Sequence, residues 1–111
     1  MSENPICIVK SGQGKNRKSF GVSFDLLAQG PASMMTIMHY RVGNTIPGHS
    51  HPNEQAGYLL SGKVKIQAGN VTHMLKSGDS YVIPANVEHS IEILENAEEL
   101  QVFSPPRPEF M

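Results

Sequence analysis

Apolar residues fall in short segments that are separated by glycine and proline along the whole chain. The segments are rich in Ile, Val, Met, Tyr and Phe, which favour strands, and the intervening glycine and proline mark turns. This spacing is typical of an all-β barrel or sandwich. Strands are predicted over residues 33–42, 55–60, 63–67, 71–75, 81–83, 90–94 and 100–103. Only residues 24–28 and 93–100 leave room for a helical turn.

One pair of predicted strands shows the pattern clearly. Val64 and Ile66 alternate with polar residues over 63–67, as in a strand with one buried face. Gly69 and Asn70 then supply the positive φ angles of a tight hairpin turn. Pro84 ends the strand over 81–83, because proline cannot donate to a ladder. Eight or more short antiparallel strands favour a closed barrel or jelly roll, since closure removes exposed sheet edges.

The 111 residues correspond to one domain, with N-terminal strands over 1–32, a barrel over 33–103 and a tail over 104–111. The 39% apolar content suffices for one modest core, and no run of about 18 apolar residues predicts a membrane span. The polar first residues give no sign of a secretory signal. A single cysteine, Cys7, excludes an intrachain disulfide and favours a cytoplasmic protein. Cys7 itself is interpreted as a residue of an apolar strand over 6–9.

The net charge is −1, so no overall field attracts nucleic acid or an anionic membrane. The one basic cluster, formed by Lys15, Arg17 and Lys18, has no aromatic residue between its members. Aromatic stacking platforms accompany basic residues in sites for single-stranded nucleic acid. We therefore interpret the cluster as a solvated strand and expect a small-molecule partner.

Three histidines and a glutamine carry the candidate chemistry. His49 and His51 are two residues apart, so on a strand they point to the same face, roughly 6.5–7 Å from each other. Two imidazoles placed in this way can bind one ion. Gln55 keeps the same parity at the start of the next predicted strand, whereas Glu54 should point to the opposite face. His89 supplies a fourth ligand from a separate segment.

The spacing of these residues resembles the two motifs of the cupin family. The motifs are matched by Gly43, His49, His51, Gln55 and Gly62, and then by Gly78, Pro84 and His89. Asn86 stands where the family has a glycine, and asparagine tolerates the left-handed conformation of that turn. Ile93 replaces a later asparagine of the family that is not a ligand. The resemblance implies an antiparallel double-stranded β-helix, the cupin barrel or jelly roll, with one divalent ion (Zn, Ni, Mn or Fe) and commonly a homodimer.

Gln55 departs from the usual family pattern, in which this ligand is a glutamate. Some cupins use glutamine here, and three neutral histidines with a neutral amide leave the charge of the ion uncompensated. Such an ion is a stronger Lewis acid and lowers the pKa of bound water further. It also favours the divalent state if the metal is iron. The ligand set favours non-redox Lewis-acid chemistry and does not exclude oxygenation.

The C-terminal sequence resembles the tail of the pectin-degradation cupins, which open 4,5-unsaturated monouronates to linear keto sugars. The resemblance covers residues 102–107 and, upstream, Met34, Met35 and His39. It implies that Phe103 and Arg107 line the substrate pocket. The guanidinium of Arg107 would hold a uronate carboxylate through two hydrogen bonds.

Gln101 is the main departure from that group, which has an acidic residue for proton transfer at this position. An amide can contact a substrate but cannot act as a general base. The loop between His51 and Gln55 is also one residue shorter than in that group. We expect a metal-dependent enzyme acting on a small carboxylated or sugar-derived substrate, with ring opening or isomerisation of an unsaturated uronate as the specific case. An iron dioxygenase and a non-catalytic ligand-binding or sensor cupin are the alternatives.

The other two histidines, His39 and His73, are interpreted as structural or surface residues. His39 shares a strand face with Arg41, and such a face is usually solvated. The methionines at 34, 35, 38 and 74 are interpreted as barrel packing rather than as metal ligands, since the site already has harder donors.

Overall fold

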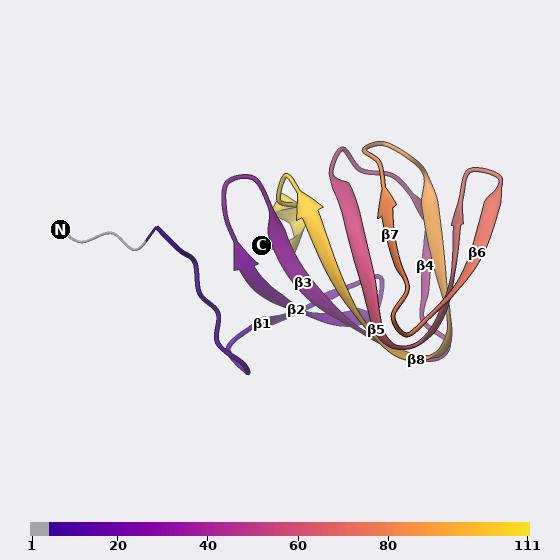
Figure 1. The fold of residues 1–111 in the computed structure, drawn as a ribbon, viewed down its shortest axis with the longest axis horizontal. Helices are drawn as coiled ribbons and strands as arrows, with labels where there is room; N and C mark the ends of the chain where they lie inside the picture. Colours follow the sequence, from indigo (N-terminus) through magenta and orange to yellow (C-terminus); the bar gives the residue numbers. More distant parts are fainter. Residues whose placement is uncertain (1–4) are drawn as a thin grey trace.

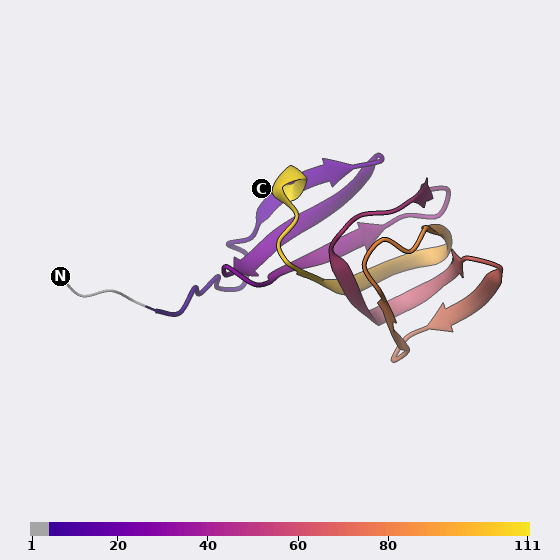
Figure 2. The ribbon, with the colours of Figure 1, turned by 90° about the horizontal axis from the view of Figure 1, so that it is seen from above.

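Eight antiparallel strands carry nearly all the regular structure of residues 5–111, the part of the chain that the computed structural model describes. They are β1 (Lys15–Ser19), β2 (Val22–Gln29), β3 (Met34–Tyr40), β4 (Thr45–His49), β5 (Glu54–Ala68), β6 (Val71–Lys76), β7 (Ser80–Ile83) and β8 (His89–Ser104), followed by the 3₁₀ turn η1 (Pro108–Phe110). The order is β1-β2-β3-β8-β5-β6, with β4 beside β8 and β7 beside β5. Figures 1 and 2 show the sheet curled around one interior. The predicted all-β, antiparallel fold is confirmed.

Two long strands, β5 and β8, pair with each other along most of their length. The sequence pattern predicts each of them as two separate strands. The structure joins the pieces because β5 bends at bulges between Leu59 and Val64, where the register shifts without breaking the ladder. Gly62 lies in this bend with φ at +84°, and an added Cβ would lie 2.2 Å from the carbonyl oxygen of Asn96 on β8. Glycine is therefore required at this crossing.

Neither of the two segments with room for a helical turn forms one. Residues 24–28 belong to β2, and residues 93–100 belong to β8. In β8, buried Ile93 is followed by exposed Glu95 and Asn96 before burial resumes at Ala97. The buried positions stay odd-numbered on both sides of this bend, and only Glu95 interrupts them, so Ile93 and Ala97 have the four-residue spacing of a helix.

The core fills the barrel with side chains from both halves of the sheet. Its largest fully buried apolar members are Phe24, Met34, Leu59, Val64 and Phe103. The turn η1 brings Phe110 back into this core, where its ring centroid lies 4.5 Å from that of Phe24. The tail thus closes one end of the barrel.

The methionines divide between the two faces of the sheet. Met34 and Met38 are buried, as predicted. Met35 and Met74 are 36% and 60% exposed, so the packing prediction is wrong for these two. Met35 alternates with its buried neighbours on β3, and Met74 lies on the outermost strand β6.

Of the described residues, those that precede β1 extend away from the barrel (Figures 1 and 2). Cys7 is exposed there and lies in no strand, so the strand predicted over 6–9 is wrong. The first four residues, on which the secretory-signal prediction depends, lie outside the described residues. No helix in the described part of the chain is long and apolar enough to cross a membrane.

The β5–β6 hairpin turns where it is predicted, between Ala68 and Val71. Of its two central residues only Gly69 has a positive φ, +59°, so the same prediction for Asn70 is wrong. A two-residue turn with a positive φ at its first central position alone also joins twisted strands.

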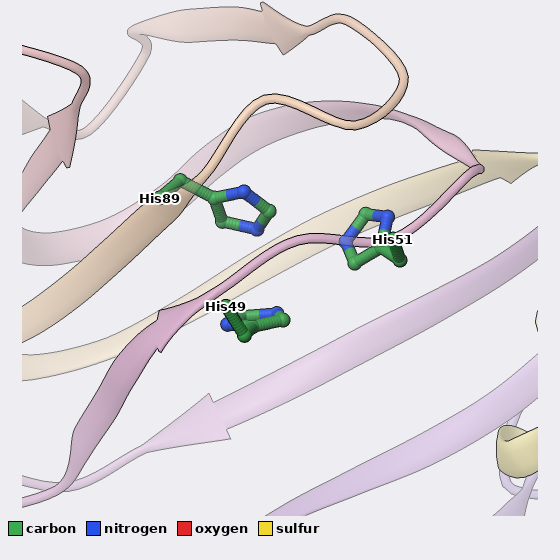
Figure 3. Close-up of side chains that lie close together, drawn as sticks. All are labelled: His49, His51 and His89. Carbon is green, nitrogen blue, oxygen red and sulfur yellow. The ribbon is translucent and has the colours of Figure 1, made fainter.

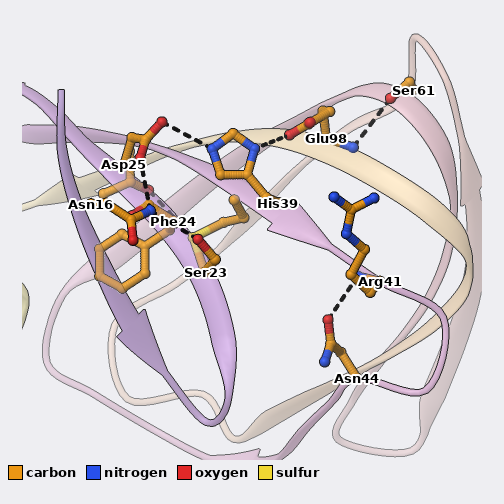
Figure 4. Close-up of polar contacts among 11 residues, drawn as sticks. Asn16, Ser23, Phe24, Asp25, His39, Arg41, Asn44, Ser61 and Glu98 are labelled. Atoms are coloured by element: carbon orange, nitrogen blue, oxygen red, sulfur yellow. Dashed lines mark hydrogen bonds and ion pairs between the residues drawn. The ribbon is translucent and has the colours of Figure 1, made fainter. Parts of the chain in front are cut away.

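His39 lies on the outer face of β3, between a carboxylate from each neighbouring strand (Figure 4). Its Nε2 is 3.0 Å from Asp25 on β2, and its Nδ1 is 2.5 Å from Glu98 on β8. The imidazole therefore ties three strands together. The structural or surface role predicted for His39 and for the exposed His73 is confirmed.

Candidate metal centre

Three histidines from two segments meet at one end of the barrel. His49 closes β4, His51 follows in the next loop, and His89 opens β8 directly opposite His49. Their candidate ligand nitrogens all lie within 4.8 Å of one another. Figure 3 shows the three rings turned toward one another. The structure thus brings together the three histidines that the spacing singled out.

The backbone fixes the protonation pattern of all three rings. Each Nδ1 donates to a backbone carbonyl two residues away, at 2.9 Å; the acceptors are the oxygens of Pro47, Asn53 and Val87. A carbonyl oxygen can only accept, so the ring proton is on Nδ1 and the lone pair is on Nε2. This carbonyl contact is how metal-binding histidines are commonly oriented.

Gln55 turns its amide into the same space. Gln55 is 3% exposed whereas Glu54 is exposed, so the parity prediction for the two residues is confirmed. The Oε1 of Gln55 lies 3.1 Å from Nε2 of His51, while its Nε2 donates to the Tyr81 hydroxyl at 2.9 Å. Two acceptors therefore face each other, which a shared cation would satisfy. His89 Nε2 is also buried and has no hydrogen-bond partner among the described residues. These donors fit a divalent metal ion.

Burial keeps two of the imidazoles neutral near pH 7. It lowers the pKa of His89 to about 4, against a weaker opposing effect of the Val87 carbonyl. Burial also lowers the pKa of His51, and the positive charge of Arg107 adds to the effect. Neutral imidazole is the form that binds metals.

A cavity of ≈ 320 Å³, including its open mouth, lies beside these side chains. Its other lining residues include Phe20, Tyr40, Gln101, Arg107 and Phe110. The loop that leads to His89 turns at Asn86, whose φ of +67° confirms the predicted left-handed conformation.

A family model for the cupin domain matches residues 36–104. The chain belongs to the cupin family. It is 30% identical over 102 residues to the pectin degradation protein KdgF of Dickeya dadantii, covering 90% of this chain and 86% of that protein. Among solved structures, an RmlC-like cupin from Shewanella frigidimarina superposes with a TM-score of 0.87 and 22% identity over 94% of this chain and 95% of that one. KdgF from Halomonas sp. superposes with a TM-score of 0.85 and 21% identity over 94% and 97% of the two chains.

Arg107 of this cupin reaches the cavity from the C-terminal tail and is only 8% exposed. Its guanidinium lies over the rings of Phe110 and Phe103, 4.1 and 5.1 Å from their centroids. Its Nε and Nη2 donate to Glu109, at 3.3 and 3.1 Å. Nη1 makes no hydrogen bond within residues 5–111, which leaves a donor for an anion.

The other two residues that were assigned to substrate binding, Gln101 and Phe103, differ in their access to the cavity. Gln101 lines the cavity. Phe103 is fully buried behind the cavity wall, where its ring packs edge-on against His51 at 5.9 Å and 78°. Phe103 has no exposed surface for a ligand in this arrangement, and its visible contribution is to support His51 and Arg107.

Sequence reasoning missed four buried or partly buried polar residues around the site: Tyr40, Asn53, Tyr81 and Glu99. Asn53 ties the histidine loop to the tail, because its Nδ2 donates to the carbonyl oxygens of Pro105 and Pro106 at 2.6 and 3.2 Å. Glu99 had a signal in the sequence: it has the parity of Gln101, so it shares that residue's inward face. No comparable pattern marks Asn53, whose partners lie over 50 residues away.

Proposed function

We propose that this cupin is a metal-dependent enzyme that holds one divalent ion (zinc, nickel, manganese or iron) through Nε2 of His49, His51 and His89 and Oε1 of Gln55. The observation that carries the proposal is the arrangement of the three rings: each Nδ1–H is bound to a carbonyl, which leaves the Nε2 lone pair free, and one ligand nitrogen from each ring lies within 4.8 Å of the others. When bound, the ion supplies a Lewis acid. Because the four donors are neutral, none of them offsets its charge.

The substrate in this proposal is a small carboxylated sugar derivative, and the reaction is ring opening or isomerisation of an unsaturated uronate. A relative at 30% identity, over most of both chains, is named for pectin degradation. The cavity is lined by His49, Gln55 and His89 on one side, and Arg107 lies in its wall with Nη1 not bonded within residues 5–111. A guanidinium packed against two aromatic rings is already positioned for a carboxylate.

Turnover of unsaturated monouronates by the metal-loaded full chain tests this function. We expect loss of the ultraviolet absorbance of the C4=C5 bond without uptake of O₂. Arg107→Lys should raise KM more than it lowers kcat, whereas Arg17→Lys, on the exposed strand β1, should change neither. Absence of turnover with any unsaturated uronate would refute the substrate assignment, and O₂ consumption would favour a dioxygenase.

We also propose that the protein is a cytoplasmic homodimer. The single cysteine supports the location. The outer face of β5, β7 and β8 supports the dimer, since Tyr58 and Val82 are 45% and 59% exposed there and line a groove with Leu100 and Val102. Light scattering should show a dimer that Val82→Lys converts to a monomer. Val71→Lys, at a similarly exposed position on β6, should leave the mass unchanged; a monomeric native chain would contradict the proposal.

A further inference from the structure

Glu99 is an acidic residue with no exposed surface, on the inward face of β8. Its Oε1 accepts hydrogen bonds from the Tyr40 hydroxyl at 3.1 Å and from the Gln101 amide at 2.5 Å. Its Oε2 is buried and has no partner among the described residues. None of the ion pairs in that part of the chain includes Glu99. A carboxyl group in this setting has neither water nor a cation to hold its charge.

The groups around Glu99 allow it to change its protonation state near neutral pH. Tyr40 faces it from β3 and Tyr81 faces it from β7, while β5 places the apolar Leu59 opposite it. Burial raises the pKa of Glu99 to about 7, and the nearby donor groups of Gln101, Tyr40 and Tyr81 oppose this rise. A general base or acid is most effective when its pKa lies near the working pH.

Tyr40 connects this carboxyl group to the cavity. Its side chain lines the cavity together with Gln55 and Gln101, and its hydroxyl donates to Glu99. Gln101 also donates to the Tyr40 hydroxyl, at 3.1 Å, so the hydroxyl is held from two sides. Gln101 itself cannot accept a proton at neutral pH. The amide thus orients a neighbouring acid instead of replacing it.

We propose that Tyr40 and Glu99 form the acid–base pair of this site, with the Tyr40 hydroxyl meeting the substrate and Glu99 acting through it. The inference rests on the proposed ring opening. It explains how a cupin with an amide at Gln101 still moves a proton. Tyr40 is the catalytic residue, and Glu99 is the positioning residue that exchanges its proton with Tyr40.

The ring opening balances with this pair alone. The anomeric hydroxyl gives its proton to the oxygen of Tyr40 as the Tyr40 proton moves to Oε1 of ionised Glu99, along a hydrogen bond already present. The released electron pair forms the carbonyl at C1, and the bond from C1 to the ring oxygen breaks. That bond's electrons form the C5 carbonyl, while the C4=C5 pair takes up a proton at C4. The proton returns from Glu99 through Tyr40, so no co-reactant is consumed.

Carbon-13 spectroscopy of glutamate carboxyl groups tests the pair without a substrate. In the zinc-loaded full chain, one carboxyl signal should titrate near pH 7. It should be missing in Glu99→Gln and present in Glu92→Gln, a control on the exposed face of the same strand. Tyr40→Phe should raise the midpoint, because the carboxylate loses a donor. The proposal is overturned if no glutamate titrates between about pH 6 and 8, or if Tyr40→Phe leaves the midpoint unchanged.

The pH profile of turnover separates this inference from the function on which it rests. Glu99→Gln keeps the shape of the side chain and should lower kcat about 10²-fold or more and abolish the rise of kcat/KM through pH 7, with unchanged metal content. A purely structural Glu99 would lower activity without removing that rise, and this result would overturn the pair. If the native chain opens no unsaturated uronate, the proposed function fails, and the carboxyl titration still decides whether Glu99 exchanges a proton with Tyr40.

Discussion

Gly62→Ala should destabilise the barrel far more than an alanine at an ordinary glycine turn. Gly62 has a φ of +84°, and its new Cβ would lie 2.2 Å from the Asn96 carbonyl oxygen and 2.6 Å from Cα of Ala97. The left-handed conformation costs alanine about 1–2 kcal/mol. Backbone atoms cannot swing aside, so overpacking adds about 1–3 kcal/mol. The expected loss in the free energy of unfolding is about 2–5 kcal/mol.

Gly69→Ala separates the two contributions. Gly69 also has a positive φ, +59°, but an added Cβ there meets nothing within 4 Å. Its loss should therefore be the conformational part alone, about 1–2 kcal/mol. Urea unfolding of the metal-free chains, followed by circular dichroism, measures both variants. Equal losses would show that the β5–β8 crossing is not as close as described, and the account of the bent strands would be wrong.

Three further predictions concern the site and its supports. Partial burial lowers the pKa of His39, but hydrogen bonds to Asp25 and Glu98 outweigh it and raise the pKa above 6.5. Because this pKa is higher in the folded than in the unfolded chain, protonated His39 stabilises the fold at a pH below the unfolded pKa, and the effect is lost as the pH rises through the folded pKa. His39→Gln should therefore lower the free energy of unfolding by about 0.5–1 kcal/mol at pH 6 and by less above the folded pKa. A loss that grows with pH would contradict the ion pairs. Asn53→Ala should release the tail and raise KM severalfold for a carboxylated substrate, and an unchanged KM would refute that link. Phe20 lies beside His49 with a φ of +52°, so Phe20→Asn should raise the free energy of unfolding by relieving backbone strain. If the variant unfolds at a lower urea concentration than the native chain, the ring packing of Phe20 outweighs the strain.

The sequence sufficed for the fold class and for the three converging histidines, because both depend on local spacing. Alternation and turn residues mark the strands. The spacing of His49 and His51 predicts a shared side, although His51 lies in the loop after β4 and not on the strand that the spacing suggested. The sequence does not predict that the short strands join into β5 and β8, since a bulge interrupts the alternation while it preserves the ladder.

The supports of the site were less accessible because they depend on contacts between distant segments. Asn53 holds the tail across more than 50 residues, and Tyr40 reaches Glu99 across 59. Glu99 also appears on an acidic stretch that composition alone marks as solvated. Its parity with Gln101 is the one local signal, and the pairing of β8 with β3 and β5 places that carboxyl group inside the barrel.

Metal analysis of the purified chain and one histidine variant tests the central claim most directly. After dialysis against zinc, nickel, manganese or iron(II), the native chain should retain about one ion per chain. His89→Ala should lose that ion, because the buried Nε2 is removed, while His73→Ala, at an exposed position on β6, should keep it. A native chain that retains none of these metals, or a His89→Ala variant that binds as much as the native chain, would contradict the assignment.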